Sequence, residues 1–111
     1  MKKPHLVRVI LETPYAGDVE RNVIYARACM RDCLKRGEAP FASHLLYTQD
    51  GILDDTIPEE RKLGIDAGFA WHPCADRSVV YTDLGISMGM RLGIAQAMEA
   101  KRPVEYRSIY E

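Results

Sequence analysis

Short β-rich runs alternate with longer segments of helical periodicity along the whole chain, and this alternation constrains the fold more than any other feature. Strands are predicted over 5–11, 39–42, 77–81 and 103–107, where apolar runs are bounded by Pro, Gly or polar residues. The segments between them are long enough for crossover helices, which join parallel strands. We therefore expect one α/β domain over 1–111. It is predicted to be Rossmann-like or flavodoxin-like, with a four-stranded, mainly parallel sheet in the order 2-1-3-4 and helices on both faces.

Three helices are predicted between these strands. The first follows Asp18, a good N-cap residue, and its apolar residues recur at spacings of four and three until Gly37. The second begins at Pro58 and carries acidic residues near the positive end of the helix dipole. The third begins at Ser87, and 43–56 is predicted to be a polar loop.

The charge balance and the cysteines exclude several classes of protein. Fifteen basic and sixteen acidic residues give a net charge of −1, which argues against binding to a nucleic-acid polymer or an anionic membrane. Three cysteines cannot all pair, and no leader or spanning apolar run is present, so a cytoplasmic protein is expected. Cys29 and Cys33 share a helix face without a second pair of ligands. No metal site and no cofactor are therefore predicted.

The segment 81–90 has the pattern of a ligand-binding turn between a strand and a helix. Asp83 follows a strand, and Gly85, Ser87 and Gly89 surround the start of the next helix. Backbone N–H groups at such a helix start, beside one carboxylate, suit a phosphorylated sugar. Two other roles remain open, because Ser87 can simply cap its helix and Asp83 can stabilise its own turn.

Ligands of open parallel sheets collect beyond the carboxyl ends of the strands, where other candidate residues are expected. Tyr15, after the first strand, either stacks on a base or packs on the sheet edge. His44, after the second strand, is either an acid or base or a structural hydrogen-bonding group. Arg21 either reaches a phosphate or belongs to a polar cluster at the start of the first helix, which Asp18 caps.

Several motifs together carry a resemblance to a known group of proteins. They are Thr13-Pro14-Tyr15-x-Gly17-Asp18-x-Glu20-Arg21-Asn22, Pro40-x-Ala42-x-His44-Leu45-Leu46, Asp54-Asp55-x-x-Pro58-Glu59-Glu60-Arg61 and Ser87-x-Gly89-Met90. In this order they resemble a family of small, often phage-encoded proteins of undefined activity. That family is related to the nucleoside 2-deoxyribosyltransferase-like, or SLOG, Rossmann-like proteins.

The resemblance implies a nucleotide-derived ligand and a homodimer or homotetramer. It places the loop after the first strand beside the base and sugar, Asp83 at the sugar hydroxyls, and the turn at the third helix around a 5′-phosphate. The loop residues are Thr13, Pro14, Tyr15 and Gly17, and the turn residues are Ser87 and Gly89. The related enzymes carry a nucleophilic Glu four residues after the glycine of that turn, and here the position is Gly93.

Glycine has no group that can attack a sugar, so the usual glycosidase mechanism is not expected. The predicted function is binding of a nucleotide or a nucleotide-derived signal, for example to sequester it during phage infection. The first alternative is an N-glycosidase or deoxyribosyltransferase that acts on deoxynucleotides and uses Glu12, Asp83 or a carboxylate from a neighbouring subunit. The second alternative is a protein-interaction factor without a small ligand.

Overall fold

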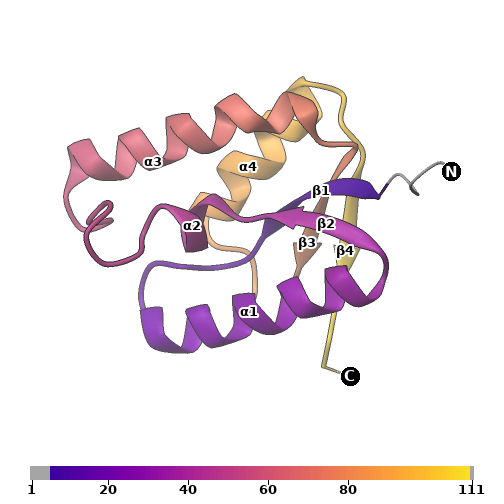
Figure 1. Cartoon of the computed structure of the whole chain (residues 1–111), viewed down its shortest axis with the longest axis horizontal. Helices are drawn as coiled ribbons and strands as arrows, with labels where there is room; N and C mark the ends of the chain where they lie inside the picture. The colour runs from indigo at the N-terminus through magenta and orange to yellow at the C-terminus, as the bar shows by residue number, and fades with distance from the viewer. Residues whose placement is uncertain (1–5, 111) are drawn as a thin grey trace, which may run out of the picture.

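A computed structural model describes residues 6–110 and contains one four-stranded sheet. The strands are β1 (Val7–Glu12), β2 (Glu38–Phe41), β3 (Arg77–Tyr81) and β4 (Val104–Arg107). All three neighbouring pairs are parallel, and the order is β2-β1-β3-β4 (Figure 1). The predicted fold class and strand order are confirmed. The expected first strand began at His5, which lies outside the described residues.

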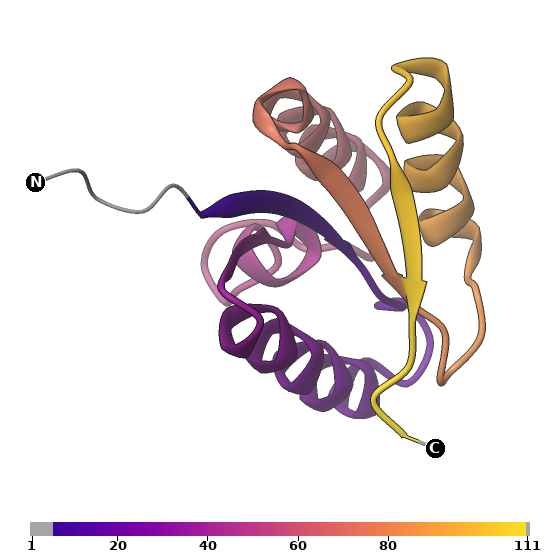
Figure 2. The same ribbon diagram turned by 90° about the vertical axis from the view of Figure 1, so that its right-hand side faces the viewer.

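Helices cover both faces of the sheet. The longer ones are α1 (Val19–Lys35), α3 (Pro58–Trp71) and α4 (Met88–Glu99). Figure 2 shows α1 against one face and α3 and α4 against the other, which is the arrangement that crossovers between parallel strands produce. The prediction of a loop over 43–56 was wrong in part, because this segment contains the short helix α2 (Ser43–Leu46). A 3-10 turn, η1 (His72–Cys74), follows α3. Within residues 6–110, none of the helices has the length and apolar character needed to cross a bilayer.

The main apolar core lies between the sheet and α1. Side chains alternate across a strand, so Val9 and Leu11 of β1 face α1 together with Val79 and Tyr81 of β3. The buried cysteines of α1, Cys29 and Cys33, complete this layer. Ile10 and Glu12 consequently point to the other face, toward α3 and α4.

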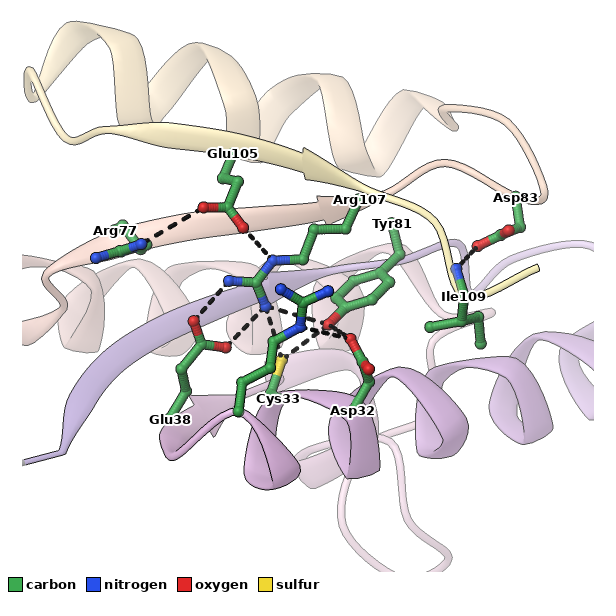
Figure 3. Close-up of polar contacts among 10 residues, drawn as sticks. Asp32, Cys33, Glu38, Arg77, Tyr81, Asp83, Glu105, Arg107 and Ile109 are labelled. Atoms are coloured by element: carbon green, nitrogen blue, oxygen red, sulfur yellow. Dashed lines mark hydrogen bonds and ion pairs between the residues drawn. The ribbon is translucent and has the colours of Figure 1, made fainter. Parts of the chain in front are cut away.

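A buried ion pair joins the two edge strands to this core. Arg107 of β4 donates from Nη1 to Glu38 Oε1 at 2.7 Å and from Nη2 to Oε2 at 2.5 Å. The hydrogen bonds from Arg107 hold the pKa of Glu38 below its ordinary value. The Tyr81 hydroxyl donates to Asp32 of α1 at 2.7 Å, so the cluster links the sheet to α1 (Figure 3). The second strand, predicted from residue 39, begins one residue earlier because Glu38 pairs with Val7 in the sheet.

Candidate functional site

A cavity of about 190 Å³ lies on the α3 and α4 face, at the carboxyl ends of the strands. The end of β1 forms its floor, and α2, α3 and the first half of α4 form its walls. An open recess adjoins it along the loop 48–56 and shares Tyr15, Asp55 and Arg61 with it. The predicted ligand residues that line the cavity are Thr13, Tyr15, His44, Ser87 and Gly89, together with the catalytic candidate Glu12.

Glu12 is the last residue of β1, and its carboxyl group lies directly against Gly93 of α4. A Cβ atom on residue 93 would fall 2.0 Å from Glu12 Oε2, so this arrangement requires glycine there. Within residues 6–110, no hydrogen bond or ion pair reaches the Glu12 carboxyl group. Burial raises its pKa to about 8, although the charge of Arg102 opposes the shift. The space beside Gly93 is therefore occupied by the Glu12 carboxyl group.

Thr13 and His44 form a polar contact in the wall of the cavity. Thr13 Oγ1 lies 2.6 Å from His44 Nε2, and the Tyr15 ring meets the imidazole edge-on. Burial lowers the pKa of His44 to about 4, so the imidazole is neutral at pH 7. The helix that carries His44 packs closely on α3, since a Cβ at Gly68 would lie 2.8 Å from Ser43 Cβ. Thr13 and His44 thus present neutral hydrogen-bonding groups.

The start of α4 carries the predicted phosphate turn. Ser87 caps the helix, because its Oγ accepts a hydrogen bond from Met90 N at 3.3 Å. Arg61 of α3 reaches the same place, and its Nη2 lies 3.8 Å from the point where a Cβ of residue 89 would be. Arg61 also donates to Asp55 at 2.8 Å. Arg61 belongs to one of the sequence motifs but was not predicted as a ligand residue, because the pattern of residues along α3 does not indicate a contact with α4.

Asp83 lies outside the cavity and anchors the C-terminal segment. Its carboxylate accepts hydrogen bonds from the Tyr25 hydroxyl and Ser108 Oγ, each at 2.5 Å, and from the amide of Tyr110 at 2.9 Å. It also accepts a hydrogen bond from the amide of Ile109 at 3.1 Å (Figure 3). Desolvation opposes ionisation, but these hydrogen bonds outweigh it and hold the pKa of Asp83 well below its usual range. The carboxylate therefore faces α1, whereas that of Glu12 faces α4. The structure does not bring the two candidate carboxylates together.

The other predicted ligand residues are also outside the cavity wall. Pro14 is buried, and Gly17 lies in the adjoining recess with a φ of 100°, a backbone conformation that favours glycine. Gly85 likewise has a φ of 84° in the turn before α4. Arg21 donates to Asn22 Oδ1 at 3.1 Å, and its backbone N–H donates to Asp18 at 3.2 Å. The predicted Asp18 cap is confirmed, and the contacts of Arg21 are those of a polar cluster at the start of α1.

One sequence family matches almost the whole described fold. Its description is a domain of unknown function, DUF7768, and the match covers residues 7–107. The chain belongs to the DUF7768 family. The matched DUF7768 region runs from β1 to β4 and includes every residue that lines the cavity. Comparisons with curated proteins and with solved structures found no match.

Proposed function

We propose that the cavity binds a nucleotide or a nucleotide-derived small molecule. The observation that carries this proposal is the meeting of two segments distant in the sequence, the loop after β1 with Thr13 and Tyr15 and the start of α4 with Ser87 and Gly89. A cavity at the carboxyl ends of parallel strands is the usual ligand site of open α/β sheets. The adjoining recess provides room for a ligand larger than the cavity alone.

The start of α4 supports the phosphate end of such a ligand. Ser87 Oγ already accepts a hydrogen bond from Met90, so the amides of the first helical turn and the Arg61 guanidinium are the groups that suit an anion. Arg61 presents several N–H donors to phosphate oxygens. Binding of a phosphate there would compete with the carboxylate of Asp55 for Arg61.

The opposite part of the cavity supports an uncharged heterocyclic base. Its walls are largely apolar, with Ile10, Ile65 and Phe69 among the lining residues. Tyr15 supplies an aromatic ring, and the neutral Thr13 and His44 pair supplies polar contacts. A small number of polar groups in an otherwise apolar cavity can orient a ligand that carries no net charge at this end.

The proposal extends to a cytoplasmic homodimer or homotetramer that sequesters its ligand. Met88 and Leu92 lie at the cavity and are 72% and 48% exposed. Exposed apolar side chains beside a cavity favour contact with a second copy.

A second candidate is an N-glycosidase or deoxyribosyltransferase, and the position of Glu12 favours it. A carboxyl group stands in the cavity at the place where Gly93 lacks a side chain. In its neutral form this group suits proton donation to the departing base nitrogen as the C–N bond breaks. Water would then add to the anomeric carbon and return a proton to Glu12.

Incubation with a panel of mononucleotides, dinucleotides, cyclic nucleotides and ADP-ribose derivatives tests both candidates. Binding to the folded state alone should raise the stability by about 2.7 kcal/mol at a hundredfold excess over Kd, measured by thermal unfolding. Free base is followed by chromatography in parallel. Stabilisation without base release supports capture, and base release that disappears in Glu12→Gln supports catalysis. If no compound stabilises the protein and no base is released, the small-molecule function is wrong and the interaction-factor alternative is favoured.

The phosphate assignment predicts a selective loss in the double variant Ser87→Ala/Gly89→Val. The double variant removes the cap and adds a branched side chain beside Arg61. It should lower the affinity for nucleotides by tenfold to about a hundredfold, because hydrogen bonds to charged groups contribute about 1.5–3 kcal/mol. Isothermal titration of each nucleotide and of its nucleoside checks this. The nucleoside is the internal control, and equal losses for both would contradict a phosphate site at α4.

A further inference from the structure

Glu12 differs from the other charged and histidine side chains that line the cavity, because it has no partner within residues 6–110. His44 contacts Thr13, and His72 of η1 contacts Gln96 at 3.0 Å. Arg61 is paired with Asp55, and Glu60 accepts a hydrogen bond from the amide of Asp54 at 2.9 Å. The Glu12 carboxyl group accordingly has its full hydrogen-bonding capacity available.

The charge that lowers the pKa of Glu12 is that of Arg102, each of whose guanidinium nitrogens already donates a hydrogen bond elsewhere. Arg102 donates from Nε to Ser78 Oγ at 3.0 Å and from Nη1 to the carbonyl oxygen of His72 at 3.3 Å, and Nη2 donates to Gln96. It acts on Glu12 through space only, without an ion pair. A partly desolvated carboxyl group without a cation or donor at contact distance favours the neutral acid.

The neutral acid has an O–H group to donate, and no acceptor of the described chain receives it. The slot that holds this group is formed by the absence of a side chain at Gly93 and is continuous with the cavity. The Glu12 side chain is partly buried and its carboxyl group is reached from the cavity, so an atom of a ligand seated there can become the partner that the chain does not provide.

We propose that Glu12 donates a hydrogen bond from its carboxyl group to an acceptor nitrogen or oxygen of the small molecule in the cavity. This inference deepens the proposed function and rests on it. It specifies a ligand with an anionic group near α4 and an unprotonated acceptor, such as a ring nitrogen or carbonyl oxygen of a base, near the end of β1. Binding then requires protonated Glu12 and weakens as the pH rises through the pKa of that group, about 8.

The ligand-free protein gives the first test. In protein labelled with ¹³C at the Glu carboxyl carbons, one signal should titrate near pH 8 and be absent from Glu12→Gln. If the signal that Glu12→Gln removes titrates near the ordinary value of 4.5, the inference is overturned whether or not nucleotides bind.

The four 2′-deoxynucleoside 5′-monophosphates, titrated between pH 6.5 and 9.5, give the second test. For any of them that binds, the affinity should approach a tenfold loss per pH unit above about 8, and Glu12→Gln should abolish this dependence. The phosphate ionises near pH 6 and His44 near pH 4, and both contributions are shared by the two proteins. Glu59→Gln, an exposed change outside the cavity, should keep the original pH profile.

The outcomes separate the two levels of the proposal. An unchanged pH profile in Glu12→Gln overturns the donor role and leaves the nucleotide site standing. If none of the four compounds binds at any pH, the same titration is made with the compound of the panel that stabilises the protein most, and failure of the whole panel overturns the nucleotide site and this role of Glu12 with it.

Discussion

Glu38→Gln should lower the free energy of unfolding by about 3 kcal/mol or more. The change keeps the shape of the side chain but removes the buried carboxylate that pairs with both Nη atoms of Arg107, whose side chain is 4% exposed. Arg107 would keep its ion pair with Glu105, but the side chain of Glu105 is 41% exposed, so the guanidinium group would lose its buried counter-charge without regaining its hydration. Urea denaturation of the two proteins at pH 7 measures the difference directly.

An exposed ion pair provides the matched control. Lys62 and Asp66 are 77% and 58% exposed, so Asp66→Asn should change the stability by no more than about 1 kcal/mol. The pH dependence adds a second check on Glu38, whose folded pKa lies below 4.5. Its contribution is present above pH 4.5 and is lost as the pH falls through the lower folded value. Equal losses in Glu38→Gln and Asp66→Asn would contradict the importance of the buried pair.

The alternation of strands and helices was enough to predict the sheet order, because few topologies satisfy parallel pairing with short crossovers. The start of β2 was less predictable. Glu38 looks like a surface residue beside Gly37, yet it is buried by Arg107, which is 69 residues away in the sequence. A contact between residues so far apart in the sequence leaves no pattern in the residues around Glu38. The short helix α2 was missed for a related reason, since its position depends on the close approach of Ser43 to Gly68 on α3.

The candidate site was predictable only where it follows from the topology. Thr13, Tyr15, His44 and Ser87 lie together because each follows a parallel strand, and the carboxyl ends of these strands share one edge. Asp83 also follows a strand, but its carboxylate is held by the segment after β4, which returns to it, and by the Tyr25 hydroxyl of α1. The ligand role of Asp83 stays a prediction, and its contacts favour an anchoring role.

Gly93 was interpreted from the sequence as the loss of an acid, whereas the structure adds a second reason for the glycine. The carboxyl group of Glu12, 81 positions earlier, occupies the space beside it. A sequence pattern analysed one helix at a time cannot show that the side chain of a strand residue fills the space beside a helix residue. The two positions form one structural unit, and their energies should therefore be coupled.

Gly93→Ala and Glu12→Ala should show this coupling as a non-additive pair of about 1–3 kcal/mol. With Glu12 present, the new Cβ would lie 2.0 Å from Oε2, so the carboxyl group must leave its slot. With Glu12→Ala in place, that obstacle is gone, and Gly93→Ala should stabilise the protein by up to about 1 kcal/mol through helix propensity. Chemical denaturation of the four proteins closes the double-mutant cycle.

Gly89→Ala is the matched control, because it makes the same change in the same helix where the nearest side-chain atoms are 3.8 and 4.0 Å from the new Cβ. Its effect should add to that of Glu12→Ala within about 0.5 kcal/mol. Additivity for Gly93→Ala as well would mean that the carboxyl group does not occupy the slot. Coupling confined to Gly93 would instead place Glu12 against α4 inside the cavity, which is the geometry that its proposed contact with a ligand requires.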